Sequence, residues 1–295
     1  MDLLDTAQDF IWNSARLVDR LRFEHLFSGG AAERVVAALR PYQNPDGGFG
    51  NALEPDFRGP ISQPTTADHA LRILSELDRP DRTLVDPLFD WLPSVTTEEG
   101  GVPMVLPSVA RYPRAPWWNP PEEVRASLLP TSGLAGFLHH HRIEHPWLGP
   151  ATEFCWRALD AVPDRLAAGG WLVQVGYDVR CAVVFLDSVP DRDRAEAVAA
   201  RLGPALIDAG VIALDPAATH EVMLPLDVAA SPDSITRRWF DDATIQAHLD
   251  AMAEGQQPDG GWTVNWEIWN PVTEPEWRGH QTVERLKTLR AYGQL

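Results

Sequence analysis

The sequence has few of the residues and runs on which several classes of protein depend. Cys155 and Cys181 are its only cysteines, too few for a disulfide framework or a cysteine-rich zinc site. It has no run of about 18 apolar residues, so no membrane-spanning helix is expected. The first residues are acidic and lack the basic and apolar regions of a signal peptide, so we expect a cytoplasmic protein.

Basic residues are also scarce. The chain has 25 lysines and arginines against 42 aspartates and glutamates, which gives a formal charge of −17. Nucleic acids are bound by basic surfaces, so no nucleic-acid partner is expected. We interpret the negative charge as favouring solubility. The sequence does not fix the oligomeric state, and a homodimer stays open.

Two motifs are present twice, near opposite ends of the chain. Q-N-P-D-G-G-F at 43–49 is echoed by Q-Q-P-D-G-G-W at 256–262. E-P-D-F-R-G at 54–59 is echoed by E-P-E-W-R-G at 274–279, and a helical pattern follows each pair of motifs. Such internal repetition indicates one structural unit that is used at least twice.

Apolar residues recur at helical spacing through most of the chain. No convincing strand pattern appears, and no linker divides 1–295, so we expect a single all-α domain. Glycine pairs beginning at 47, 100, 169 and 260, with Gly210 between them, divide the chain into about five helical pairs. The helices are predicted over 3–27, 31–39, 65–77, 81–92, 127–141, 147–161, 176–187, 191–208, 241–254 and 280–292.

The string Q-x-P-D-G-G-[FW] resembles the QW-type repeat of squalene–hopene and oxidosqualene cyclases, and the related repeat of protein prenyltransferase β subunits. The resemblance implies an α/α toroid of five to six helical hairpins, with each repeat between an outer and an inner helix. Asp46 and Asp259 would cap helices or turn the backbone, and Phe49 and Trp262 would seal neighbouring helices. If the ring closes, the two E-P-x-aromatic-R-G loops become neighbours beside a central cavity.

The catalytic motifs of these families are missing. S-Q-P-T-T-A at 62–67 stands where a class II cyclase has its proton-donating D-x-D-D run, and D-D-A-T-I at 241–245 does not match the metal-binding D-D-x-x-D run. Asp178 and Cys181 are three residues apart, so they do not form the Asp-x-Cys pair of the prenyltransferase zinc site. No metal and no cofactor are therefore expected.

Three other aspartates could supply an acid. Asp68, Asp178 and Asp227 lie near the expected starts of inner helices. A carboxylic acid in an aromatic cavity has a raised pKa and can donate a proton. Each could equally be an N-cap or first-turn carboxylate that favours the helix dipole.

Charged and aromatic residues near the expected cavity form a candidate binding site. Two arginines at the cavity mouth would suit a carboxylate or diphosphate, but each could instead brace its own loop by pairing with a glutamate. Tryptophans that flank prolines or an Asn-Pro pair, together with histidines and a tyrosine near helix starts, would line the pocket. The candidate residues are Arg58, Arg278, Glu54, Glu274, Trp118, Trp269, His69, His280 and Tyr177.

Three functions fit these patterns. The leading one is an enzyme of terpene-cyclase-like or prenyltransferase-like type, a lyase or isomerase, acting on a mainly apolar substrate such as a prenyl diphosphate. The second is a carbohydrate-active toroid of glycoside hydrolase, epimerase or lyase type that uses a carboxylate pair, because aromatic faces stack on sugars as well as stabilising carbocations. The third is a non-catalytic binding protein that keeps the ring.

Overall fold

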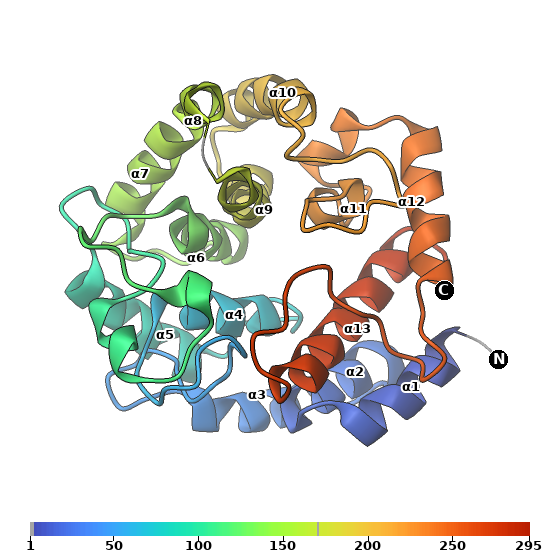
Figure 1. The fold of residues 1–295 in the computed structure, drawn as a ribbon. Coiled ribbons are helices and arrows are strands. Elements are labelled where there is room, and N and C mark those ends of the chain that lie inside the picture. The colour runs from blue at the N-terminus through green and yellow to red at the C-terminus, as the bar shows by residue number, and fades with distance from the viewer. Residues whose placement is uncertain (1–2, 170) are drawn as a thin grey trace.

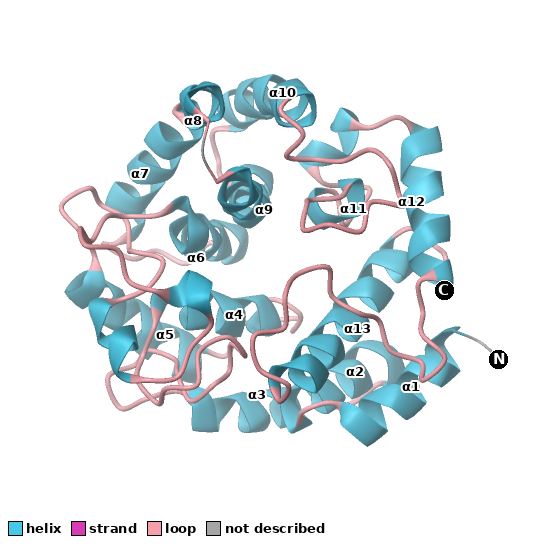
Figure 2. Ribbon diagram, in the orientation of Figure 1, coloured by secondary structure: helices cyan, strands magenta, loops and turns pink. Residues whose placement is uncertain are grey.

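The structure is a computed structural model that describes residues 3–169 and 171–295. Within these ranges the regular secondary structure is helical (Figure 2), and β-structure is limited to isolated bridges such as Gln43–Phe49. The all-α prediction is confirmed. The α-helices are α1 (Leu3–Ser14), α2 (Leu17–Ser28), α3 (Ala32–Leu39), α4 (Pro64–Leu74), α5 (Arg82–Trp91), α6 (Leu128–His141), α7 (Leu148–Asp160), α8 (Val162–Ala168), α9 (Leu172–Ser188), α10 (Arg192–Asp208), α11 (Pro225–Val228), α12 (Asp242–Glu254) and α13 (Thr273–Ala291).

Short 3₁₀ segments join several of these helices. Their bounds are Arg40–Tyr42, Leu92–Val95, Pro107–Arg111, Pro116–Trp118 and Ile235–Trp239. No helix in the described ranges is both long and apolar enough to cross a membrane.

The helices surround a common centre (Figure 1). Helices α4, α6, α9, α11 and α13 lie nearer the centre, and α5, α7, α8, α10, α12 and α1 lie at the periphery. Helix α13 packs against α1, α2 and α12. The last helix therefore contacts the first two, and both ends of the chain lie on the same side of the molecule.

Both copies of the Q-x-P-D-G-G motif fold into the same turn. Gln43 Nε2 donates to the carbonyl of Gly47 at 2.9 Å, and Gln256 Nε2 donates to the carbonyl of Gly260 at 2.9 Å. The φ angles of Gly47 and Gly260 are 93° and 91°, a conformation that side chains with a Cβ rarely adopt. The repeated sequence therefore specifies a repeated backbone shape.

Each of these turns docks closely on an outer helix. A Cβ on Gly47 would lie 2.1 Å from the carbonyl oxygen of Pro87 in α5, and one on Gly260 would lie 1.9 Å from that of Thr6 in α1. The first turn thus packs on α5, the second α-helix after it in the chain. The last turn packs on the first helix, so the same contact joins the C-terminal repeat to the N-terminus.

The motif aspartates turn the backbone and do not cap a helix. Asp46 Oδ1 accepts from the backbone N–H of Gly48 at 2.9 Å, and Asp259 makes the same contact to the second glycine of its own pair at 3.1 Å. Phe49 and Trp262, the aromatic residues that follow, are buried in the hydrophobic core, as expected.

The largest differences from the predicted helix boundaries concern three helices. The predicted helix over 3–27 is two helices, because Arg16 is extended and its guanidinium donates to the carbonyls of Ala52 and Leu53. Helices α9 and α13 begin at Leu172 and Thr273, earlier than the predicted starts at 176 and 280. Residues expected in the first turns of inner helices therefore lie well inside them.

Candidate functional site

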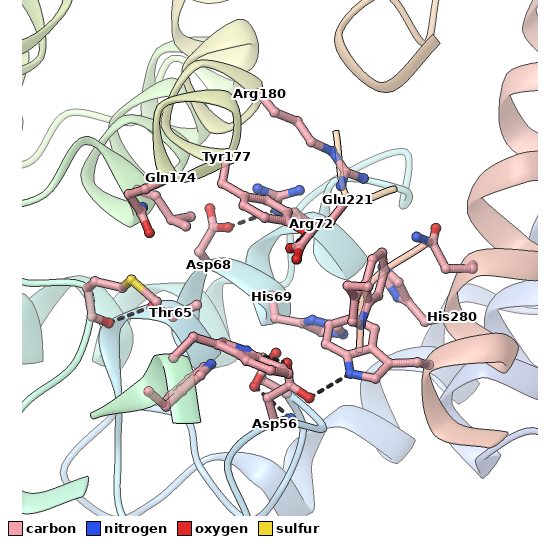
Figure 3. Close-up of a pocket in the computed structure, with 18 of the residues that line it drawn as sticks. Asp56, Thr65, Asp68, His69, Arg72, Gln174, Tyr177, Arg180, Glu221 and His280 are labelled. Atoms are coloured by element: carbon pink, nitrogen blue, oxygen red, sulfur yellow. Dashed lines mark hydrogen bonds and ion pairs between the residues drawn. The ribbon is translucent and has the colours of Figure 1, made fainter. Parts of the chain in front are cut away.

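A cavity of about 170 Å³ opens between the inner helices and the loops that precede them (Figure 3). Pockets for drug-sized ligands typically have volumes of roughly 300–1,000 Å³, so this cavity suits a small ligand. Its walls are strongly aromatic. The aromatic lining residues are Trp117, Trp118, Trp171, Tyr177, Trp266 and Trp277.

The first E-P-D segment supplies two carboxyl groups to this cavity. Asn51 and Ala52 have positive φ angles of 58° and 61°, and these angles turn the chain inward just before the segment. Glu54 then accepts from the backbone N–H of Asp56 at 3.0 Å. Glu54 is 5% exposed and Asp56 4% exposed, and both line the cavity.

Asp56 is held by indole donors on both oxygens. Trp117 Nε1 donates to Oδ2 at 2.9 Å, and Trp277 Nε1 donates to Oδ1 at 2.8 Å. Burial raises the pKa of Asp56, and the indole N–H groups oppose that rise. The indoles therefore favour the ionised carboxylate and fix its orientation.

Glu54 has a different environment. Burial, together with the adjacent Asp56 carboxylate, raises the pKa of Glu54 well above its ordinary value, and only backbone N–H groups and Arg16 oppose this. Glu54 therefore keeps its proton to a higher pH than an ordinary glutamate. Both pKa values are raised, that of Glu54 more strongly, and of the two only Asp56 has side-chain donors that favour its charged form. Neighbouring carboxyl groups whose surroundings separate their pKa values are a recurrent arrangement for acid–base chemistry.

Asp68 lies in the cavity as one half of an ion pair. Arg72, one turn later on α4, donates from Nε to Asp68 Oδ2 at 2.8 Å. Although burial opposes it, the Asp68 carboxylate raises the pKa of Arg72. Asp68 is therefore a charged partner of Arg72 and a poor candidate for the acid.

Two imidazoles lie side by side at the base of the cavity. The rings of His69 and His280 are 4.6 Å apart between centroids. Burial and nearby arginine charges lower the pKa of both well below the ordinary histidine value, so both rings are neutral near pH 7. Nε2 of His69 is fully buried and has no hydrogen-bond partner within the described ranges.

The opposite side of the cavity is polar. Tyr177 donates its hydroxyl to Glu221 Oε1 at 3.0 Å. Burial and the Glu221 carboxylate raise the pKa of Tyr177, so the phenol stays protonated. Arg180 lies beside this pair (Figure 3).

Two of the three predicted acids lie outside the cavity. Asp178 is buried against Arg165, with 2.7 Å between Oδ2 and the guanidinium, and it also accepts from Gln174 at 3.0 Å. Asp227 accepts from the backbone N–H of Leu224 at 2.8 Å at the start of α11. Both carboxylates therefore have structural partners. Asp227 is a first-turn carboxylate, as in the alternative interpretation, whereas Asp178 lies well inside α9.

The two copies of the second motif do lie side by side, as predicted. Arg58 forms an ion pair with Glu276, and Trp277 reaches Asp56. The guanidinium of Arg58 is thus occupied by the other copy. Arg58 braces the contact between the first copy and α13 and does not line the cavity.

The remaining predicted members of the second copy are also outside the cavity. Arg278 donates to both oxygens of Asp259 at 2.7 and 2.9 Å and lies over the ring of Phe10. Glu274 is exposed in the first turn of α13. The predicted anion site made of two arginines is therefore absent from this cavity.

The predicted tryptophans have separate positions. Trp118 lines the cavity and stacks on Phe57, with 5.5 Å between ring centroids. Trp269 packs beside it in a small hydrophobic cluster, and its indole N–H also lowers the pKa of Asp56. Residues missed from the sequence include Asp56, Arg72 and Arg180. Of these, Asp56 carried a signal, since it belongs to the repeated motif.

No family model and no curated protein matches the chain. Among solved structures, one described as a protein from Actinoplanes is similar over 99% of this chain and 98% of its own, with a TM-score of 0.62. The two sequences are 20% identical. A likeness at this identity concerns the fold alone, so the chemistry has to be argued from the cavity.

Proposed function

We propose that the protein is a terpene-cyclase-like enzyme, an isomerase that acts on a small, mainly apolar alkene in the central cavity of an α/α toroid of five to six helical hairpins. The toroid is supported by the inner and outer placement of the helices (Figure 1) and by the contact of the last repeat with α1. The isomerase is supported by the aromatic walls and the carboxyl pair.

The observation that carries the proposal is the contrast between Glu54 and Asp56. Glu54 has the more strongly raised pKa, as suits a proton donor, while Asp56 is held by two indole N–H groups that favour its ionised form. A proton donor beside a fixed carboxylate and aromatic faces suits a reaction in which positive charge develops on carbon.

The proposed reaction is a shift of a double bond. The Glu54 carboxyl transfers its proton to one alkene carbon, and the π electron pair forms the new C–H bond. The neighbouring carbon becomes cationic, and Asp56 and the tryptophan faces stabilise it. A proton on the next carbon then passes to the Asp56 carboxylate, and the electrons of that C–H bond form the new double bond. Exchange with water restores both side chains.

The substrate of this proposal has no diphosphate. Arg58 and Arg278 are paired with Glu276 and Asp259. Of the arginines that line the cavity, Arg72 is paired with Asp68, which leaves Arg180 as a single cation. Diphosphates are usually held by several free cationic groups. An uncharged substrate fits this cavity better than a prenyl diphosphate.

Deuterium incorporation tests the proposal. The purified protein is incubated with limonene or linalool in D₂O, and the recovered alkenes are analysed by mass spectrometry. One deuterium per turnover is expected, because the Glu54 proton exchanges with solvent. Glu54→Gln should abolish incorporation, and Glu274→Gln, the matched change in the second motif, should leave it intact.

A carbohydrate-active enzyme is the second candidate, because the same cavity has two carboxyl groups among tryptophans. Its test is the release of p-nitrophenol from a panel of p-nitrophenyl glycosides. Glycoside cleavage without deuterium incorporation would show that the protein is a carbohydrate-active enzyme and not an isomerase. Absence of both activities would favour the non-catalytic binding protein.

A further inference from the structure

Arg22 is a fully buried arginine of α2 at the back of the cavity. Its guanidinium donates to Glu76 at 2.6 and 2.9 Å, to Asp19 at 2.9 Å and to Glu284. Its NH1 also lies 2.9 Å from Nδ1 of His280. A guanidinium has only donors and stays charged in proteins, so in this contact Nδ1 must be the acceptor.

This contact sets the tautomer of His280. A neutral imidazole carries one N–H, and a ring whose Nδ1 accepts must carry it on Nε2. The charged groups around the ring are Arg22, Arg16 and Glu284, and the neutral His69 lies against it. Burial and the nearby positive charges favour the neutral ring over the attraction of Glu284.

The Nε2–H group of His280 has no hydrogen-bond partner in the described ranges of the chain. His280 lines the cavity (Figure 3), and its Nδ1 side is occupied by Arg22. A donor that lines the cavity without a protein partner is available to a ligand oxygen.

We propose that His280 is a fixed hydrogen-bond donor to an oxygen atom of the ligand, and that Arg22 is the positioning residue that holds it in the Nε2–H form. The inference rests on the proposed function only in taking this cavity as the ligand site. The ligand class is a small apolar compound with one uncharged carbonyl, hydroxyl or ether oxygen.

Three features support an uncharged oxygen over an anion. His69 and His280 are both neutral, because burial lowers the pKa of each, so this end of the cavity offers dipoles and no free cation. The nearest full charge, Arg22, is already paired with three carboxylates. The Asp56 carboxylate lines the same cavity and would repel an anion.

The tautomer can be measured on the unaltered protein. Nitrogen-15 NMR of the histidine rings distinguishes protonated from unprotonated nitrogens. We expect a protonated Nε2 and an unprotonated Nδ1 for His280 at neutral pH. A protonated Nδ1, alone or in an imidazolium, would overturn the assignment.

The ligand class is tested with two probes of the same shape, cyclohexanone and methylenecyclohexane. We expect the ketone to bind about tenfold more tightly, as one hydrogen bond to a buried donor allows, and to shift the Nε2–H signal of His280. His280→Phe should remove the preference, and His280→Gln, which keeps an N–H donor, should restore part of it. Equal binding of both probes, or a ketone that leaves the His280 signal unchanged, would refute the proposal.

The role of Arg22 needs a variant with a matched control. Arg22→Lys keeps the charge but should release Nδ1, giving a mixture of tautomers and a weaker ketone preference. Lys287→Met alters the same ionic network through Glu76 and Glu284 without touching His280, so the tautomer should stay unchanged. An Arg22→Lys protein with a pure Nε2–H form would remove Arg22 from this role.

These measurements need no turnover. A ketone preference without deuterium incorporation would preserve the His280 assignment and reject the isomerase. Deuterium incorporation without a ketone preference would support the isomerase and refute the assignment of His280.

Discussion

The two copies of the repeat have the same first half and different second halves. The Q-x-P-D-G-G turns have matching hydrogen bonds and glycine φ angles. After them, the first copy places Glu54 and Asp56 in the cavity, whereas the second leaves Glu274 exposed and pairs Glu276 with Arg58. A repeated motif can therefore have a shared structural role and an unshared site.

The difference follows from where the inner helix begins. Helix α4 starts at Pro64, after the whole first copy, so residues 54–59 stay in a loop that can turn inward. Helix α13 starts at Thr273, so the second copy lies in the first turns of a helix. Acidic residues there favour the helix dipole and face solvent. Only the loop copy is free to present carboxyl groups to the cavity.

The largest expected effect comes from the paired glutamates. Glu54→Gln should lower kcat/KM by about 10²–10⁴-fold, which is the usual contribution of a general acid. Glu274→Gln should leave kcat/KM unchanged, because that carboxylate is exposed in α13. Steady-state kinetics on the substrate found by deuterium incorporation gives both values. Equal losses in the two variants would contradict the division between the copies.

The shared half of the repeat is tested by its glycines. Gly47→Ala and Gly260→Ala should each lower the free energy of unfolding by about 3 kcal/mol. Both glycines have a positive φ, and an added Cβ would clash with a backbone carbonyl oxygen. Gly29→Ala is the control, since its φ is 70° but nothing lies within 4 Å of an added Cβ. It should cost about 1 kcal/mol. Urea unfolding measures all three, and a tolerated Gly260→Ala would show that the docking on α1 is loose.

Much of the fold could be predicted from the sequence, because its signals are local. Apolar spacing predicted most helices, and the motif glycines predicted the turns between them. The failures have tertiary causes. Arg16 interrupts the predicted first helix to reach carbonyls of the loop at 52–53, and no pattern within residues 3–27 contains that partner.

The site was less predictable, because it depends on partners distant in sequence. Glu54, His69, His280, Trp118 and Tyr177 were expected near the cavity and do line it. The motif could not show that Asp56 would meet tryptophans 61 and 221 residues away. Nor could helix periodicity show that Asp178 would be buried against an arginine of α8.

The pH dependence of stability should also separate the copies. Because the pKa of Glu54 is raised by folding, the folded state binds its proton more tightly than the unfolded state does. Its contribution to stability is thus complete below the unfolded pKa and is lost as the pH rises through the folded pKa. The loss amounts to about 1.4 kcal/mol for each pH unit that separates the two pKa values. Urea unfolding between about pH 4 and pH 8 should show it in the wild type and in Glu274→Gln, and not in Glu54→Gln. A Glu54→Gln curve parallel to the wild type would mean that Glu54 is not held protonated by folding.

The smallest effects are expected from the motif arginines, which the sequence placed at the ligand. Arg58→Met and Arg278→Met should each reduce the free energy of unfolding by about 0.5–1 kcal/mol, because both ion pairs are partly exposed and screened by solvent. Arg58→Met should have the larger effect, since Arg58 joins the two copies, whereas Arg278 stays within one. Ketone binding and kcat/KM should be unchanged in both variants. A loss of ligand affinity at an unchanged melting temperature would show that these arginines bind the ligand, and it would favour an anionic substrate. Removal of a purely structural ion pair should not weaken ligand binding unless it also destabilises the fold.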